Sequence, residues 1–421
     1  MKHILSLVLL TLSGLASAKE NEPSLLIDNA RVAIIGDSIT EQKLYSKYIE
    51  TYLLACTGRK DIRCFQFGWS GETAGGFKQR LENDLSVFSP TVATTCYGMN
   101  DGRYVPFAEA VGKDYEANMR AVVTGMQRVG VKSIVVGTPG AVDTRYFVKA
   151  GASADQYNDS LARLGGLGHK LSGEFHTGFA DVHREMTEAM TKAKAALGAD
   201  YDVCGRDGVH PGPNGHLLMA AAFLKGLGCD GDIGTITADM QGTSTTTDGH
   251  KLLSQQGGAL QIESTTWPFC FDGDAQSPGG TRSILAFCKF NDELNRLTLQ
   301  VKNLTAAKAK VTWGTESKEF TRDQLTKGIN LAAEFTKTPF DAAFTKLIGA
   351  VGSKQGYETP MIKGMITNFR NFAADAKADP EFAGALEVLK KKMLAKQEML
   401  DADARKLVVP VKHTIKIEAA N

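Results

Sequence analysis

The stretch RVAIIGDSIT, residues 31–40, passes from four consecutive apolar residues into a glycine and then into polar side chains. An apolar run of this length that ends at a turn is typical of a strand buried on both faces of a parallel sheet. Ligands of open parallel sheets bind outside the carboxyl ends of the strands. We therefore expect Ser38, which follows this run, to lie at a ligand-binding edge.

Similar apolar runs alternate with helical stretches as far as about residue 227. The predicted strands are 31–35, 62–67, 91–97 and 132–137, with a fifth within 173–180, and the predicted helices are 44–55, 77–88, 114–129, 157–171 and 217–227. This alternation indicates βαβ units, which give a parallel sheet covered by helices on both faces. Right-handed crossovers leave few topologies. We predict an α/β fold with a three-layer, doubly wound parallel sheet.

The pattern changes near residue 230. Residues 231–316 are rich in Gly, Thr and Ser and contain runs of alternating polarity, which predict a small antiparallel β module. Residues 321–408 are predicted to be helical, with their many charges on a solvated face. A last strand is predicted at 411–419. The predicted organisation is an α/β domain at 19–230 and an accessory region at 231–421.

The composition excludes several classes of protein. Hydrophobic residues make up 43% of the chain and charged residues 23%, which are ordinary globular values. Lys and Arg number 48 against 47 Asp and Glu, so the basic excess expected of a nucleic-acid-binding protein is missing. Only one long apolar run occurs, at the N-terminus. We expect neither a nucleic-acid partner nor stable insertion in a membrane.

The N-terminus has the three-part layout of a secretory signal. Residues 1–3 are short and basic, residues 4–15 are apolar, and Ala16-Ser17-Ala18 is a small-residue ending. The apolar run is too short to span a bilayer, which takes ~20 residues. We predict a signal peptide at 1–18, cleaved after Ala18, and a periplasmic or secreted mature protein. The alternative is a buried N-terminal helix.

Export would place the seven cysteines where disulfides persist. The sequence does not determine the connectivity. No C-x-x-C or H-x-x-x-H spacing occurs, so no metal site is expected. The candidate pairs are Cys56–Cys64, Cys270–Cys288 and Cys204–Cys229, with Cys96 left over.

Four polar motifs follow predicted strands or precede the last helix of the α/β domain. Taken singly, each is typical of an ordinary turn or helix cap. Their occurrence together and in this order is far more specific. The motifs are Gly36-Asp37-Ser38, Gly68-Trp69-Ser70-Gly71, Gly98-Met99-Asn100-Asp101 and Asp207-Gly208-Val209-His210.

These residue types suit acyl transfer. The hydroxyl of Ser38 needs a neighbouring base before it can act as a nucleophile. Asp207 and His210 lie three residues apart, so one loop can aim the imidazole at the serine while the carboxylate holds its tautomer. A backbone N–H of Gly71 and the side-chain amide of Asn100 could both stabilise an oxyanion.

Together the four motifs resemble the SGNH hydrolases, also called GDSL-type esterases, over roughly residues 31–227. The resemblance implies a flavodoxin-like fold and a serine esterase that needs no cofactor. It implies Ser38 as nucleophile, His210 as general base and Asp207 as its orienting acid. The oxyanion hole would be formed by Gly71, Asn100 and the backbone N–H of Ser38. Where the GDSL name has Leu after the serine, this chain has isoleucine.

Two other histidines compete for the role of the base. His183 lies in an Asp-x-His sequence after a predicted strand, and His216 lies shortly after His210. His210 is preferred because Asp207 stands at the family spacing. His183 is expected to begin a surface helix instead.

Three functions remain open at this stage. Export and the added β module favour an esterase that removes O-acyl groups, above all acetyl groups, from small or polymeric carbohydrates. Trp69, Trp267 and Trp313 are candidates for stacking on sugars, or else for core packing. Residues 104–107 could line an acyl pocket. The alternatives are a general short-chain or lipase-like esterase and a non-catalytic carbohydrate-binding protein.

Overall fold

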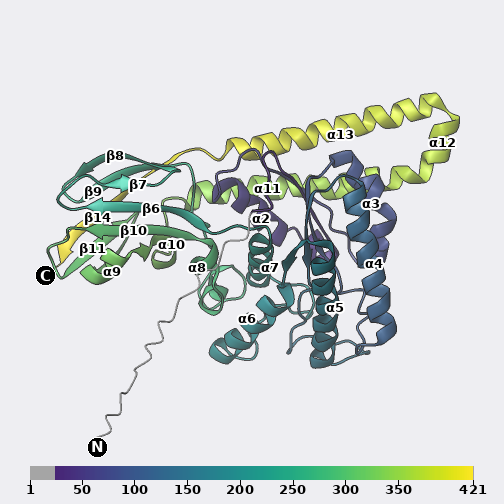
Figure 1. The fold of residues 1–421 in the computed structure, drawn as a ribbon, viewed down its shortest axis with the longest axis horizontal. Helices are drawn as coiled ribbons and strands as arrows, with labels where there is room; N and C mark the ends of the chain where they lie inside the picture. Colours follow the sequence, from purple (N-terminus) through teal and green to yellow (C-terminus); the bar gives the residue numbers. More distant parts are fainter. Residues whose placement is uncertain (1–23, 421) are drawn as a thin grey trace, which may run out of the picture.

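Figure 1 shows the computed structural model of the protein, which describes residues 24–420. The predicted signal peptide lies outside these residues. The elements of the first half are β1 (Arg31–Gly36), α1 (Ser38–Glu41), α2 (Tyr45–Ala55), β2 (Arg63–Gln66), α3 (Ala74–Phe88), β3 (Val92–Cys96), α4 (Glu109–Arg128), β4 (Ser133–Gly137), α5 (Ala154–Phe175), β5 (Gly178–Ala180), α6 (Val182–Leu197) and α7 (Pro213–Gly226).

The five strands form one parallel sheet in the order β2-β1-β3-β4-β5. Side chains alternate between its faces. Val32 and Ile34 of β1 therefore enter a core shared with α2 and α7, whereas Ala33 and Ile35 enter a core shared with α3 and α4. Both faces are covered, and the predicted three-layer α/β fold is confirmed. The helix expected to begin near His183 is α6.

The second half adds two further sheets. Its elements are β6 (Asp232–Asp239), β7 (Thr245–Thr246), β8 (His250–Gln256), β9 (Ala259–Ser264), η1 (Arg282–Phe287), α8 (Phe290–Leu294), β10 (Arg296–Lys302), β11 (Lys308–Trp313), β12 (Glu316–Thr321), α9 (Arg322–Lys327), β13 (Ile329–Asn330), α10 (Leu331–Glu334), α11 (Asp341–Met361), η2 (Ile362–Thr367), η3 (Arg370–Phe372), α12 (Ala373–Ala378), α13 (Pro380–Lys406) and β14 (Val411–Ala420).

One sheet has the order β13-β10-β6-β7 and the other the order β12-β11-β14-β9-β8. The second sheet is antiparallel throughout, as expected. In the first sheet β6 and β10 pair in parallel, which the sequence pattern did not predict. A parallel pair needs a long crossover, and the chain between these strands is long enough to supply one.

The long helices α11 and α13 lie side by side and run from the β sheets across the α/β domain, with α12 at the far tip (Figure 1). Helix α11 packs on α2 and β2. Lys354 of α11 is fully buried and contacts Glu50 of α2 at 2.6 Å and Glu358 at 3.2 Å. The expectation of a solvated charged face is wrong at these positions, because the buried charges are paired with one another.

The predicted disulfides are wrong. All seven cysteines lie within residues 24–420, and none of them is joined to another. The sulfur of Cys270 lies 3.5 Å from the hydroxyl of Thr338, and it is not bonded to Cys288, its predicted partner. Cys56 and Cys64 are both buried as free thiols. A disulfide needs Cβ atoms about 4 Å apart, and closeness along the chain does not supply that.

Candidate active site

Ser38, Asp207 and His210 come together at the carboxyl edge of the parallel sheet. His210 Nε2 lies 2.8 Å from Ser38 Oγ, and His210 Nδ1 lies 2.6 Å from Asp207 Oδ2. The carboxylate accepts the Nδ1 proton, so Nε2 is left to accept a proton from the serine hydroxyl. Hydroxyl, imidazole and carboxylate thus form one hydrogen-bonded chain.

The turn after β1 sets the position of Ser38. Asp37 is the N-cap of the short helix α1, and its Oδ1 accepts the N–H of Ile39 at 2.9 Å. Ser38 is the first residue of α1, where backbone N–H groups have no partner within a helix. Asp37 is buried, and burial raises its pKa to about 7. Asp37 therefore shapes the turn that carries Ser38.

The loop before α7 sets the position of the acid and the base. Asp207 Oδ1 accepts the backbone N–H groups of Val209 and His210, each at 2.9 Å. Partial burial raises the pKa of Asp207, but these bonds and the imidazole outweigh it and lower the pKa below its usual value. The carboxylate is therefore ionised at neutral pH and fixed opposite the imidazole.

The two predicted oxyanion donors lie on the neighbouring loops. Gly71 is exposed and has a φ of 73°, a left-handed conformation that favours glycine. Asn100 Nδ2 donates one hydrogen to the carbonyl of Glu72 at 3.0 Å, which leaves its second hydrogen for a ligand. Tyr104 donates its hydroxyl hydrogen to Asn100 Oδ1 at 3.1 Å and so fixes the orientation of the amide.

A buried ionic network supports these loops, and the motif analysis did not include it. Glu72 forms two hydrogen bonds with Arg80, at 2.7 and 2.8 Å, and accepts the hydroxyl of Tyr97 at 2.7 Å. Asp101 accepts the N–H groups of Ala74 and Gly98, each at 3.0 Å, and so ties the second motif to the third. Burial raises the pKa of Asp101 to about 6.

The part of the chain that carries this site is similar to known proteins. Residues 34–218 match the model of the GDSL-like lipase/acylhydrolase family. This part of the chain is therefore similar to the GDSL-like hydrolases. The likeness is to lipases and acylhydrolases, which are enzymes that hydrolyse esters.

Two relatives illustrate how far the likeness reaches. An acetylxylan esterase of Geobacillus stearothermophilus is 28% identical over 191 residues, which are 44% of this chain and 80% of that protein. A structure described as a gut microbial diltiazem-metabolizing enzyme aligns with a TM-score of 0.72 at 19% identity, over 94% of this chain and 98% of the other. That structure shares the fold of the GDSL-like domain together with the C-terminal region.

The competing histidines of the GDSL-like domain are engaged elsewhere. His183 Nδ1 lies 3.0 Å from the carbonyl of Gly140. His216 is fully buried; its Nδ1 accepts the N–H of Tyr45 at 3.2 Å and its Nε2 donates to Gln42 at 3.0 Å. Burial lowers the pKa of His216 to about 3, so it stays neutral. Of these three histidines, His210 is the one that contacts Ser38.

Of the two roles considered for the tryptophans, core packing is confirmed for two of the three. Trp267 and Trp313 are fully buried in the core of the C-terminal region. Trp69 is half-buried beside the second motif, and the cations of Arg80 and Lys363 lie 4.9 and 4.8 Å from its ring centre.

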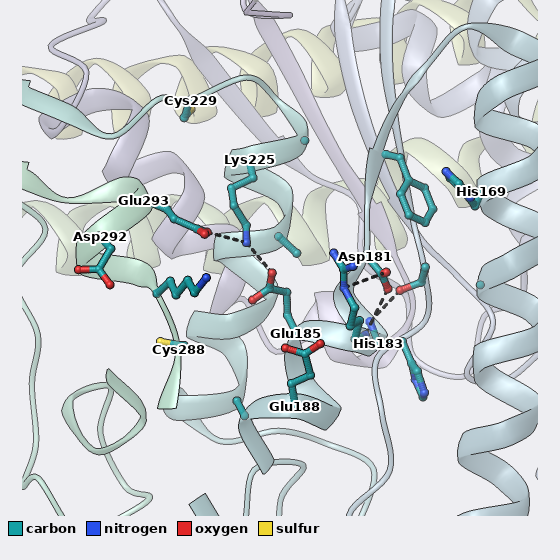
Figure 2. A pocket seen from close by; sticks show the side chains of 18 of the residues that line it. His169, Asp181, His183, Glu185, Glu188, Lys225, Cys229, Cys288, Asp292 and Glu293 are labelled. Atoms are coloured by element: carbon teal, nitrogen blue, oxygen red, sulfur yellow. Dashed lines mark hydrogen bonds and ion pairs between the residues drawn. The ribbon is translucent and has the colours of Figure 1, made fainter. Parts of the chain in front are cut away.

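A groove of about 1290 Å³ lies away from this site, between α5, α6, the end of α7 and the η1–α8 segment (Figure 2). His183 lines it, whereas none of the five predicted site residues does. Lys225 bridges Glu185 and Glu293 across the groove at 2.5 and 3.0 Å. These paired charges join the GDSL-like domain to the C-terminal region, and we assign the chemistry to the Ser38 site instead.

Within residues 24–420, no cluster of three or more His, Cys, Asp or Glu side chains is arranged to hold a metal ion. The same residues contain no helix that is long and apolar enough to cross a membrane.

Proposed function

We propose that the protein is an exported serine esterase that removes O-acetyl groups from carbohydrates. The observation that carries the proposal is the hydrogen-bonded chain from Ser38 Oγ through His210 to Asp207, with distances of 2.8 and 2.6 Å. Such a chain supplies a nucleophile, a base and an orienting acid in the arrangement that acyl transfer requires. The nucleophile and the base are both accessible, because Ser38 and His210 are only half-buried.

In the first step Ser38 Oγ attacks the carbonyl carbon of the ester while His210 Nε2 takes the hydroxyl proton. The negative charge that develops on the carbonyl oxygen is stabilised by the N–H groups of Ser38 and Gly71 and the amide of Asn100. The imidazolium then gives its proton to the leaving alcohol, and an acyl-enzyme remains. Asp207 stays ionised and stabilises the imidazolium.

In the second step a water molecule replaces the alcohol. His210 takes a proton from the water, which attacks the acyl carbon, and the oxyanion donors act again. Collapse returns the proton to Ser38 Oγ and releases the carboxylic acid. The chain's own residues supply every proton transfer in this cycle.

The acetyl and carbohydrate parts of the proposal rest on separate support. The acetylxylan esterase relative aligns across most of its own length with the GDSL-like domain. The ring of Tyr104 is fixed beside the oxyanion donors by its bond to Asn100 and by stacking on Tyr157 with ring centres 5.1 Å apart. A ring held there favours a short acyl group. Export rests on the sequence of residues 1–18.

The test compares hydrolysis of aryl acetate, butyrate and octanoate, and release of acetate from acetylated xylo-oligosaccharides. Wild-type protein and Ser38→Ala are assayed side by side. We expect acetate to be the preferred acyl group, acetate release from the oligosaccharides, and loss of both activities in the variant. Preference for octanoate would replace the proposal with a lipase-like esterase. Folded protein that binds the oligosaccharides without turnover would replace it with a carbohydrate-binding protein.

A further inference from the structure

The C-terminal region reaches the proposed oxyanion site through a single turn of π-helix. Helix α11 contains Pro360 near its end, and the chain continues as the π-helical turn η2, Ile362–Thr367. Proline lacks the N–H that the helical ladder needs, so the ladder is interrupted there. Wide turns of this kind are frequent at functional sites. Turn η2 packs against α3, which directly follows the second motif.

Lys363 of this turn is tied to the second motif through one carboxylate. Its ammonium lies 2.7 Å from Glu41 Oε1, at the end of helix α1. The other oxygen, Glu41 Oε2, accepts the backbone N–H of Ser70 at 2.5 Å and its hydroxyl at 2.6 Å. Lys363 and Glu41 are 25% and 20% exposed, so water screens the pair only in part. Ser70 directly precedes Gly71.

Thr367, four residues further on, is tied to the network beneath the same loop. Its hydroxyl donates to Asp84 Oδ2 at 2.8 Å, and Arg80 donates to the same oxygen at 2.7 Å. Arg80 in turn holds both carboxylate oxygens of Glu72. Turn η2 therefore contacts the loop from two sides, once through Glu41 and once through Asp84.

Gly71 lies in a turn that is closed by one backbone hydrogen bond, from the Glu72 N–H to the Trp69 carbonyl at 3.1 Å. A Cβ atom built on Gly71 would meet nothing within 4 Å, so the space on that side of the residue is open. An oxyanion donor must nevertheless lie within a few tenths of an ångström of its productive position. Beyond that bond, the preceding peptide is held by the pair of hydrogen bonds that Ser70 donates to Glu41.

We propose that Lys363 is a positioning residue of the esterase, which acts through Glu41 to hold the Ser70–Gly71 peptide so that the Gly71 N–H faces the developing oxyanion. The inference rests on the proposed function. A donor aimed at the oxyanion stabilises the transition state rather than the bound substrate, so its loss lowers kcat and leaves KM nearly unchanged.

The experiment measures kcat and KM with an aryl acetate for Lys363→Met, Lys363→Arg and a matched control, Lys346→Met. Lys346 is an exposed lysine of α11 for which residues 24–420 supply no hydrogen bond or ion pair. We expect Lys363→Met to lower kcat by about tenfold to a hundredfold with KM within about twofold. We expect Lys363→Arg to recover kcat to within about threefold of wild type, because it restores the cation beside Glu41.

Unchanged kcat in Lys363→Met, or an equal loss in Lys346→Met, would overturn the inference. Glu41→Gln is the second variant, and it decides the matter if Lys363→Met does not fold. We expect Glu41→Gln to have a lower kcat and an unchanged KM. Full activity of Glu41→Gln would overturn the inference. Ser38→Ala, assayed in parallel, separates the two levels. Turnover by Ser38→Ala would overturn both the proposed function and this inference. An inactive Ser38→Ala together with a fully active Lys363→Met would overturn this inference alone.

Discussion

Each half of the molecule contains a serine hydroxyl hydrogen-bonded to an imidazole. In the GDSL-like domain Ser38 Oγ lies 2.8 Å from His210. In the C-terminal region Ser264 Oγ lies 2.7 Å from His250 Nδ1 and 2.9 Å from His413 Nε2, across strands β8, β9 and β14 (Figure 1). By distance alone, both are candidates for a nucleophile and its base.

The partners beyond the imidazole distinguish them. Trp313 donates its indole N–H to His413 Nδ1 at 3.1 Å, and His250 Nε2 donates to the carbonyl of Ile233 at 2.8 Å. Two neutral imidazoles therefore satisfy the whole chain, with Ser264 Oγ accepting from His413 and donating to His250. Among residues 24–420, no carboxylate forms a hydrogen bond or ion pair with these two rings that would stabilise an imidazolium, whereas Asp207 contacts His210.

The two clusters also differ in how accessible their side chains are to a substrate. Ser264 is fully buried and His250 and His413 are nearly so, whereas Ser38 and His210 are half-buried. The comparison teaches that a serine–histidine contact becomes a candidate for catalysis only with a carboxylate behind it and a substrate path in front. We interpret the Ser264 cluster as a structural polar network of the second half.

The largest expected contrast is in catalysis. Ser38→Ala removes the nucleophile and should lower kcat by about ten-thousandfold or more. Ser264→Ala should leave kcat within about threefold of wild type, since its hydroxyl touches no substrate. Initial rates with an aryl acetate check both variants. Loss of activity in a correctly folded Ser264→Ala would place the chemistry in the C-terminal region instead of the GDSL-like domain.

The carboxylate is the second point of contrast. Asp207→Asn should lower kcat by about a thousandfold to ten-thousandfold, because the amide leaves His210 in the wrong tautomer. Asp200→Asn is the control, since the side chain of Asp200 forms an exposed ion pair with Arg145. Steady-state rates at pH 7.5 measure both. A loss below tenfold in Asp207→Asn would make the carboxylate dispensable and remove the distinction drawn above.

For stability we expect the opposite order, with a larger loss in Ser264→Ala than in Ser38→Ala. Ser264→Ala leaves two buried imidazole nitrogens without partners and should lower the free energy of unfolding by about 2–4 kcal/mol. Ser38→Ala, at a half-buried position, should change it by less than about 0.5 kcal/mol. Urea denaturation followed by circular dichroism measures both. Equal values for the two variants would mean that the Ser264 network contributes no specific stabilisation.

The smallest effect is a pH dependence of stability. Burial, and then the neighbouring His250, lowers the pKa of His413 to about 4 in the folded state. The unfolded chain has an ordinary pKa of about 6.5, so it binds the proton first as the pH falls. Stability is therefore complete above pH 6.5 and is lost as the pH falls from there to 4, by about 2 kcal/mol at pH 5.

His413→Gln should remove this part of the acid sensitivity. The remaining histidines with lowered pKa values, His183, His216 and His250, keep their share of the pH dependence in the variant. Melting temperatures from pH 7 to pH 4.5 provide the measurement. An identical slope in wild type and His413→Gln would show that His413 is protonated in the folded state as readily as in the unfolded one.

The parts of the structure that the sequence predicted are local. The strand before Ser38 and the Asp207–His210 spacing are each contained within ten residues, so hydrophobic pattern and motif suffice to recognise them. The parallel sheet then follows from the alternation of strands and helices.

The parts that the sequence did not predict depend on distant residues. Lys363 meets Glu41 across most of the chain, and Lys354 meets Glu50 in the same way. A lysine in a charged helical stretch carries no mark of its eventual partner, so these side chains looked like a solvated face. The disulfide predictions failed for the related reason that neighbours in sequence, such as Cys56 and Cys64, need not be neighbours in space.

Strand β14 has a consequence for how the chain is made. It lies inside its sheet, hydrogen-bonded to β9 on one side and β11 on the other. The hairpins β8–β9 and β11–β12 are therefore synthesised before β14, the strand that pairs with both of them. About 150 residues are synthesised between β9 and β14. During that interval each hairpin exposes an unpaired edge, which is a site for aggregation. Chaperone protection of the nascent chain should matter most for this half of the molecule, and deletion of residues 411–420 should send it to aggregates or proteases.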